Sequence, residues 1–479
     1  MQRFDTQVQY LRYKVLREVA RHAFEGKLME SFTSIPKLIA PGPKPTMRCC
    51  VYKERAILAE RIQVAINGVP EDTDQIIQVI DIACDECPVS GYLVSADCRG
   101  CIAHRCQEAC PRDAIYFDEN QKAHIDKSKC IECGRCANVC PYSAIHNYKR
   151  PCVRNCKAGA ISMNEEGVAM IDKSKCTDCG ACVYQCPFGA ITDKTYLLSV
   201  VEQLKGVLNG GQKKVYALVA PAIASQFKGP KLGQVIAGIK ALGFTDVIEV
   251  ALGADLIALE ETKELVEKGF LTSSCCPAFV NYIEKQHSNM LKFKSHNLSP
   301  MAALGKKVRE LDPEGYIVFI GPCIAKKSEI LRPEVKPYID AVLTFEELKA
   351  LFDCRSIVLE EQEEAEVDDA SYFGRIFARS GGLTEAVRQA IVELGLEDQF
   401  DFRPITCDGL EECRAALLKA AHNTLGYNFI EGMACTGGCI GGAGCVNHGV
   451  RNRSEIDKYG KSAGEKSIGE AVEKSLFNK

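Results

Sequence analysis

The chain has 479 residues, 46% of them hydrophobic, and a formal net charge of −4. This length allows about two to four domains, and the small negative charge excludes general nucleic-acid binding or attraction to an anionic membrane. No apolar run approaches the length of a membrane-spanning helix. The stretch "MQRFDTQVQYLRYK" lacks the apolar core of a signal peptide. We therefore expect a soluble, cytoplasmic protein that binds neither nucleic acid nor membrane.

Residues 1–80 are expected to form a helical N-terminal region. Stripes such as "VQYLRYKVLREVARHAF" repeat apolar residues at helical spacing. The proline-rich segment "IAPGPKPTMRCC" interrupts them. Its last two residues, Cys49 and Cys50, have no metal-binding spacing, and we expect them to be buried structural thiols.

The most informative feature is the content of 27 cysteines, sixteen of them between residues 84 and 186. A reducing cytoplasm disfavours disulfides, so metal ligation is the leading interpretation. The segment contains an internal repeat. "AHIDKSKCIECGRCANVCPYSAI" (123–145) returns as "AMIDKSKCTDCGACVYQCPFGAI" (169–191), a shift of 46 residues. Two similar units therefore follow one another.

The spacing C-x2-C-x2-C-x3-C-P predicts bacterial-type 4Fe–4S ligation. Three thiolates from one loop bind a cubane, and the fourth, before the proline, binds the other cluster of the pair. Soft thiolates suit this chemistry, and zinc does not need the triple spacing. We expect two α+β bacterial ferredoxin-like units, residues 81–146 and 147–195. The expected ligand sets are Cys98, Cys101 and Cys106 with Cys140; Cys130, Cys133 and Cys136 with Cys110; and Cys176, Cys179 and Cys182 with Cys156.

The second unit leaves two cysteines, Cys152 and Cys186, short of partners. The repeat places Ala144 and Asn147 where the first unit has cysteines. Upstream, Cys84 and Cys87 form an unused C-x2-C pair, and we propose that they complete a fourth cluster. The alternative is that this cluster has been lost and that the pair has another role. Three or four 4Fe–4S clusters are thus expected ahead of the second half of the chain.

From about residue 212 the pattern becomes α/β, and we place a further domain at 210–479. Strand-like runs such as "KVYALVAPA" and "GYIVFIGP" alternate with helical patterns such as "ALEETKELVEKG". Three separated cysteine motifs occur here: "TSSCCPAF", "GPCIAKKSE" and "EGMACTGGCIGG". Thiolates converging from three such loops could hold one cubane, with helix N-termini and glycine backbone around it.

The three motifs, in this order and spacing, resemble those of [FeFe]-hydrogenases over roughly residues 212–450. The resemblance implies an α/β catalytic domain, with two lobes of open mixed sheets around an H-cluster, preceded by ferredoxin-like repeats. It implies that the cubane of the H-cluster binds the motif cysteines, with Cys439 bridging to a diiron subsite that carries CO, cyanide and an azadithiolate. The residues that the resemblance assigns to the H-cluster are the ligands Cys276, Cys323, Cys435 and Cys439, the cyanide donor Lys326, and the neighbours Met433, Ala220 and Pro221.

The same resemblance implies a proton relay. Cys275, beside the ligand Cys276, matches the thiol that hands protons to the bridge amine. Glu261, Glu264 and Ser295 match the relay of the family, and Lys268 stands where an arginine ends it. On residue pattern alone, without this resemblance, a solvated surface would be the favoured interpretation of the two glutamates, which lie three apart on one helix face.

Several departures resemble the less-studied group B branch of the family. "CCPAF" replaces a tryptophan-containing motif, Gly321 replaces a methionine, and Cys445 is additional. We expect Cys354, Cys407 and Cys413 to be buried fillers.

The expected function is reversible reduction of protons to H2, with electrons relayed by the N-terminal clusters. The alternatives are a non-catalytic hydrogenase-like assembly protein and an H2 sensor. No nicotinamide or flavin fingerprint is present. The expected partners are therefore a ferredoxin, a flavodoxin or a flavoprotein subunit, together with hydrogenase maturation proteins.

Overall fold

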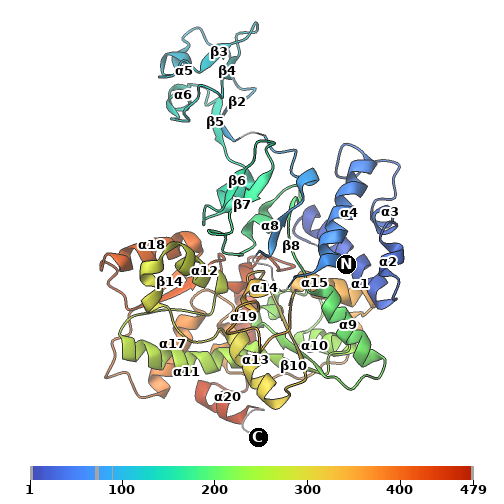
Figure 1. Ribbon diagram of the computed structural model, residues 1–479. Coiled ribbons are helices and arrows are strands. Elements are labelled where there is room, and N and C mark those ends of the chain that lie inside the picture. Colours follow the sequence, from blue (N-terminus) through green and yellow to red (C-terminus); the bar gives the residue numbers. More distant parts are fainter. Residues whose placement is uncertain (1–3, 71–74, 89, 476–479) are drawn as a thin grey trace.

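A computed structural model describes residues 4–70, 75–88 and 90–475. Figure 1 shows a large α/β body, with two small β-hairpin units rising from it in line. The unit with β3 and β4 lies farthest from the body, and the unit with β6 and β7 lies between them. The cysteine-rich repeats of the sequence thus form a stalk on the body.

The N-terminal region is helical, as the apolar stripes predict. Thr6 caps the first helix, because its hydroxyl accepts the backbone N–H of Gln9 at 3.1 Å. The Cys50 sulfur caps the fourth helix at the N–H of Lys53, and Cys49 is exposed, so the expectation of two buried thiols was wrong. The helices of this region are α1 (Gln7–Phe24), α2 (Leu28–Ser31), α3 (Ile35–Ile39) and α4 (Val51–Asn67).

Each ferredoxin-like unit contains a β-hairpin and two short helices. In the first unit β3 pairs with β4, and β2 pairs with β5, both antiparallel. The elements of the first unit are β2 (Gly91–Val94), α5 (Arg105–Glu108), β3 (Ile115–Phe117), β4 (Ala123–Ile125), α6 (Arg135–Val139) and β5 (Ile145–Tyr148). Those of the second are α7 (Pro151–Asn155), β6 (Ile161–Met163), β7 (Ala169–Ile171), α8 (Ala181–Gln185) and β8 (Ile191–Asp193).

The second unit includes chain from before the first. Strand β1 (Ile77–Val79) precedes the first unit, yet it pairs antiparallel with β8, matching Ile77 to Asp193. The helical turn η1 (Asp81–Ala83) follows directly and leads to Cys84. The first unit is therefore inserted into the second in space, although the repeats are consecutive in sequence.

The α/β body contains two parallel sheets, one of order β10-β9-β12-β13 and one of order β11-β15-β14. Every strand pairing in these two sheets is parallel, so the expectation of mixed sheets was wrong, whereas the α/β class is confirmed. Helical connections between successive strands allow the parallel arrangement. The strands are β9 (Val215–Val219), β10 (Asp246–Glu249), β11 (Leu271–Thr272), β12 (Tyr316–Gly321), β13 (Ala341–Thr344), β14 (Pro404–Asp408) and β15 (Phe429–Met433).

Helices cover both sheets and bury their apolar strands. The α-helices are α9 (Leu197–Leu208), α10 (Leu232–Ala241), α11 (Val250–Lys268), α12 (Pro277–Gln286), α13 (Pro300–Leu311), α14 (Lys326–Glu329), α15 (Phe345–Cys354), α16 (Tyr372–Ile376), α17 (Gly382–Glu393), α18 (Leu410–Ala421), α19 (Asn452–Lys461) and α20 (Ile468–Lys474). The 3-10 turns are η2 (Pro221–Ser225), η3 (Ser288–Phe293), η4 (Leu359–Glu361) and η5 (Cys439–Gly441). Among the described helices, none is both long enough and apolar enough to cross a membrane.

A buried ionic network joins the three parts of the chain. Lys327 of α14 places its Nζ 2.8 Å from Asp193, at the end of the second ferredoxin-like unit, and 2.8 Å from Glu347 of α15. Arg12 of α1 reaches Asp193 at 2.7 Å. These side chains are at most 8% exposed, so each charge depends on its partners for compensation.

Candidate H-cluster and iron–sulfur sites

The three cysteine motifs lie at the carboxyl ends of parallel strands. "SSCC" follows β11, "PCIA" follows β12, and "ACTGGC" follows β15. Ala220 and Pro221 directly follow β9. Since the carboxyl ends of parallel strands share one edge of a sheet, loops from both sheets can meet there.

These loops enclose one small cavity of about 80 Å³. It contains cysteines from each of the three motifs together with apolar side chains. Its lining includes Ala220, Pro221, Cys275, Cys276, Phe319, Cys323, Lys326, Met433 and Cys439. The structure thus brings together the residues expected around the H-cluster, with Cys435 on an adjoining wall.

Cys435 lies between this cavity and the second ferredoxin-like unit. It lines a separate open cavity of about 430 Å³ together with Cys179. The pKa of Cys435 is raised well above its usual range, by burial first and then by the neighbouring thiols of Cys323, Cys276 and Cys179. The third motif is therefore one part of the α/β body that approaches the second ferredoxin-like unit.

The donor set suits an iron–sulfur cluster. Burial raises the pKa of Cys439 to about 12, and it also raises the pKa of Cys323. A thiol in such surroundings ionises readily only when a cation replaces its proton, and soft thiolates favour iron–sulfur clusters. Among the described residues, no three His, Cys, Asp or Glu side chains could hold a metal ion. A cubane differs from a single ion because each thiolate binds a different iron.

Lys326 brings a buried positive charge to the cavity. Its Nζ donates to the Ser299 hydroxyl at 2.8 Å and lies 2.7 Å from Glu329. Burial lowers the pKa of Lys326, but the Glu329 carboxylate, with smaller contributions from Cys323 and Cys275, offsets this, and the net pKa is raised. The ammonium is therefore held in its charged form against the cavity wall.

The inner part of the expected proton relay is fully buried. Glu261, on α11, is 0% exposed, and its Oε1 accepts both the N–H of Ser274 at 2.9 Å and the Ser274 hydroxyl at 3.0 Å. Its other oxygen, Oε2, has no hydrogen-bond partner among the described residues. Burial raises the pKa of Glu261 to about 7. The Glu261 charge in turn contributes to a raised pKa of Cys275, after burial itself.

The outer part of the relay leads to solvent. The Ser295 hydroxyl donates to Glu264 Oε2 at 2.8 Å, and Glu264 Oε1 receives the Lys268 ammonium at 2.6 Å. Side-chain exposure increases from 12% at Glu264 to 25% at Lys268 and 73% at His296, whose ring contacts Lys268 at 3.3 Å. The expected relay residues thus form a graded series from the cavity to the surface.

Sequence reasoning missed three polar residues of this site. Ser274 lies inside the motif "TSSCCPAF", and both its N–H and its hydroxyl bind Glu261. Asn297 donates to Glu264 at 2.9 Å, and Ser299 holds Lys326. The run "TSSCC" carried a signal for Ser274; the other two depend on contacts that only the fold creates.

The departures from the family pattern have structural explanations. A side-chain atom at Gly321 would lie 2.5 Å from the Phe319 ring, so Phe319 fills that space. Phe279, which replaces the tryptophan, packs over Gly432 and is fully buried. Cys445 is also fully buried, and its sulfur lies 3.7 Å from the Cys439 carbonyl.

Three further cysteines, Cys354, Cys407 and Cys413, were expected to be buried packing residues. Cys407 and Cys413 are buried, which confirms that expectation for both. Cys354 is only partly buried.

The first ferredoxin-like unit has two separate cysteine cages. The sets match those expected from spacing, and each lines its own cavity. One contains Cys98, Cys101, Cys106 and Cys140; the other contains Cys110, Cys130, Cys133 and Cys136.

The second unit repeats the backbone contacts of the first with the same shift of 46 residues. In the first unit the N–H of Ala123 points to the Cys98 sulfur at 3.5 Å. In the second, the N–H of Ala169 points to the Cys84 sulfur at 3.4 Å. Cys84 therefore occupies the place of Cys98 in the second unit, although the expected boundaries put it at the start of the first unit.

The other cysteines of the second unit are grouped as in the first unit. The pKa of Cys152 is raised to about 11, by burial first and then by Cys186, Cys84 and Cys87. The pKa of Cys182 is raised by burial and by Cys179, Cys176, Cys156 and Cys152. Two groups of four thiols are thus brought together, including both residues of the upstream pair.

The fold and cysteine sites define an iron–sulfur protein with a hydrogenase-like α/β domain. Residues 213–443 match the family described as "Iron only hydrogenase large subunit, C-terminal domain". Residues 97–144 match a 4Fe-4S dicluster domain, and residues 169–192 match a 4Fe-4S binding domain. The chain therefore carries the C-terminal domain of the iron-only hydrogenase family behind 4Fe–4S ferredoxin domains.

Similar proteins include hydrogenases and assembly proteins. The chain is 28% identical over 404 residues to Iron hydrogenase 1 of Clostridium pasteurianum, covering 72% of this chain and 69% of that protein. It is 26% identical over 326 residues to cytosolic iron-sulfur assembly component 3 of Mus musculus, covering 54% and 68%. A solved structure of [FeFe]-hydrogenase HydA1 from Chlamydomonas reinhardtii matches with a TM-score of 0.48 and 20% identity, over 57% of this chain and 91% of that one.

Proposed function

We propose that the protein interconverts protons and H2 at an H-cluster in the cavity between the two sheets. Cys276, Cys323, Cys435 and Cys439 would hold its cubane, and Cys439 would also bind the diiron subsite. When bound, this cofactor supplies the metal centre at which protons and electrons combine. The observation that carries the proposal is the graded series of proton-carrying side chains that ends at the cavity, because a purely structural cluster does not require one.

In this proposal the chain supplies and removes protons along named atoms. Cys275, whose thiol lines the cavity, holds the last proton. Glu261, with a pKa of about 7, can both accept and donate near neutral pH. Ser295 would carry protons between Glu261 and Glu264. Glu264 is ionised because Lys268 and Ser295 outweigh its partial burial and lower its pKa. Protons therefore enter from the exposed end at His296 and Lys268.

The cavity also positions the cofactor. Lys326 would donate to a cyanide ligand, since a buried ammonium suits an anionic acceptor. Met433, Ala220 and Pro221 line the same cavity with apolar surface.

Electrons would arrive through four ferredoxin-type cubanes. The contacts repeated at a shift of 46 residues support a fourth cluster held by Cys84, Cys87, Cys152 and Cys186. Cys179 and Cys435 line one cavity, which supports transfer from the cluster of the second unit to the third motif. The first unit, at the far end of the stalk in Figure 1, would receive electrons from a ferredoxin, a flavodoxin or a flavoprotein subunit.

Infrared spectroscopy of the matured protein tests the function. Production together with hydrogenase maturation proteins should yield bands of metal-bound CO and cyanide, and the product should evolve H2 from reduced viologen. An assembly protein would lack the bands. An H2 sensor would show the bands but little turnover. Matured protein with verified bands and no H2 production or uptake under anoxia would overturn the enzymatic proposal.

The two adjacent cysteines offer a second test. Cys276→Ser should damage the cluster itself and weaken the CO and cyanide bands, because it removes a ligand. Cys275→Ser should leave the bands in place. Equal loss of the cluster in both variants would contradict the separate roles proposed for them. Membership of the group B branch stays a prediction from the motif departures.

A further inference from the structure

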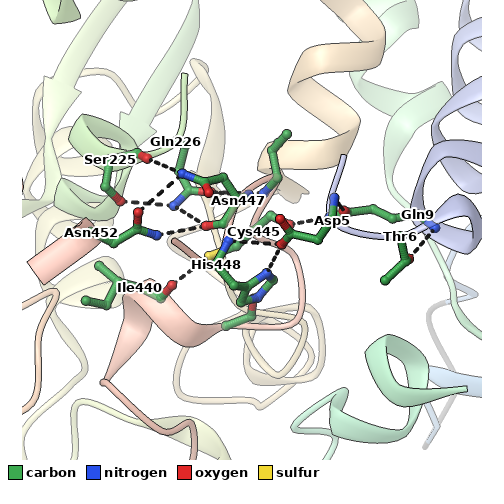
Figure 2. Close-up of polar contacts among 12 residues, drawn as sticks. Asp5, Thr6, Gln9, Ser225, Gln226, Ile440, Cys445, Asn447, His448 and Asn452 are labelled. Carbon is green, nitrogen blue, oxygen red and sulfur yellow. Dashed lines mark hydrogen bonds and ion pairs between the residues drawn. The ribbon is translucent and has the colours of Figure 1, made fainter. Parts of the chain in front are cut away.

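The loop after the third motif is held by the N-terminal segment of the chain. Figure 2 shows Asp5 and Gln9 contacting the segment 445–448, which is more than 430 positions away in sequence. Gln9 Nε2 donates to the Cys445 carbonyl at 2.6 Å. The N–H of Asp5 donates to the same Gln9 side chain at 3.0 Å, so Asp5 and Gln9 hold each other in position.

His448 contacts two acceptors at once. Its Nδ1 lies 2.7 Å from Asp5 Oδ2, and its Nε2 lies 2.9 Å from the carbonyl oxygen of Gly442. A carbonyl oxygen only accepts, so Nε2 must carry a hydrogen. A carboxylate likewise accepts, so Nδ1 carries one as well. The geometry therefore favours an imidazolium, balanced by the Asp5 carboxylate.

This imidazolium is directed at the loop that follows the proposed ligand Cys439. The Gly442 carbonyl also accepts the N–H of Cys445 at 3.0 Å, and the N–H of Gly442 donates to the Cys439 carbonyl at 3.0 Å. These hydrogen bonds connect His448, through Gly442, to the backbone of the third motif at Cys439.

The ring of His448 also faces the second ferredoxin-like unit. Its centroid lies 4.3 Å from that of Tyr184 on α8, the helix that carries Cys182. His448 and Tyr184 line the same open cavity as Cys179 and Cys435. His448 thus lines the cavity that one thiol of a proposed cubane, Cys179, shares with the third motif.

The opposite side of the loop is fixed independently. Gln226 Oε1 accepts the N–H of Val446 at 2.9 Å, and Asn447 Nδ2 donates to the Ser225 carbonyl at 3.1 Å (Figure 2). These bonds do not involve His448. A change at His448 should therefore alter the charge beside the cluster without releasing the loop.

We propose that His448, held by Asp5, is a positioning residue that raises the reduction potential of the cubane bound by Cys156, Cys176, Cys179 and Cys182. A reduced cluster carries one more negative charge, and a nearby cation stabilises that form. The titratable groups in contact with the ring are the Asp5 carboxylate and the Tyr184 side chain, and Cys179 lines the same cavity. The inference rests on the cluster assignment made under the proposed function.

Electron paramagnetic resonance titration of the cluster-loaded protein tests this role, and the diiron subsite is not needed. His448→Gln keeps a donor for Gly442 but loses the charge, so the midpoint potential of the cubane should become more negative. At pH 6, Asp5→Asn removes the negative partner, so the potential should become more positive. His448→Arg retains the charge and should stay near the wild-type value.

The opposite signs of the expected potential shifts distinguish an electrostatic role of His448 from a purely structural one. His448→Gln and Asp5→Asn break the same contact, so a merely structural effect would shift both potentials in one direction. Shifts of the same sign, or no shift in either variant, would overturn the proposal. Iron content is measured in parallel, because a wild-type protein without this cluster would refute the cluster assignment rather than the role of His448. His422→Gln, on a histidine outside the lining of the shared cavity, serves as the control.

Discussion

Replacing Glu261 with glutamine tests the proton relay through two independent measurements. Glutamine has almost the same shape, and its amide oxygen can still accept the N–H of Ser274, but it cannot carry a proton. Because Glu261 is the only acidic residue proposed between Cys275 and Ser295, turnover should fall by a factor of about 10² to 10⁴, the usual contribution of a general acid–base group.

The same substitution should change how stability depends on pH. The pKa of Glu261 is about 7 in the folded protein, against an ordinary value of 4.5, so the folded state holds this proton more firmly than the unfolded state. The resulting stabilisation is complete below pH 4.5 and is lost as the pH rises to about 7. The difference amounts to about 3 kcal/mol. Glu261→Gln removes this dependence, so the variant should gain stability relative to the wild type as the pH rises.

The assay combines H2 evolution with anaerobic unfolding scans between pH 5 and pH 8. A constant offset between the proteins does not matter, because the informative quantity is the change of their stability difference with pH. Glu260→Gln is the matched control: Glu260 lies beside Glu261 on α11, but its side chain is 56% exposed and pairs with Lys263. Wild-type turnover in Glu261→Gln, with intact CO and cyanide bands, would refute the relay. A stability difference that is flat with pH would refute the buried, neutral carboxyl.

Three further predictions concern other parts of the molecule. Cys275→Ser should lower turnover by orders of magnitude while Cys275→Asp retains more, because a carboxyl still exchanges a proton; equal rates in H2 assays would contradict this. The wild type without a diiron subsite should bind about 20 irons per chain, and joint replacement of Cys84 and Cys87 by serine should lower this to about 16; an unchanged iron analysis would exclude the fourth cluster. Lys327→Met should destabilise the protein by about 3–5 kcal/mol, because it leaves Asp193 buried without its ammonium, and a shift in unfolding midpoint measures it. A loss below about 1 kcal/mol would show that Arg12 alone compensates that charge.

Residues that are close in the chain made much of this protein predictable. A C-x2-C-x2-C loop brings its thiolates together through local backbone geometry alone, so the two cages built on this loop could be predicted before the fold was known. The set of Cys98, Cys101 and Cys106, whose last spacing is longer, was predicted from its place in the repeat. The helical N-terminal region and the α/β alternation followed from hydrophobic periodicity, which reports the face that each element buries. The hydrogenase-like domain followed from the order of three motifs.

Only the tertiary structure decided which distant segments meet. Cys84 joins the second ferredoxin-like unit because β1 pairs with β8, and no local spacing records that pairing. The parallel order of the two sheets depends on how the helical crossovers pack, so strand patterns alone could not exclude mixed sheets. Ser299 contacts Lys326, and Asp5 contacts His448, because helices and loops that are far apart in sequence pack together in the folded protein. Local spacing fixes what a loop can bind, whereas burial against remote segments fixes which charges and protons surround it.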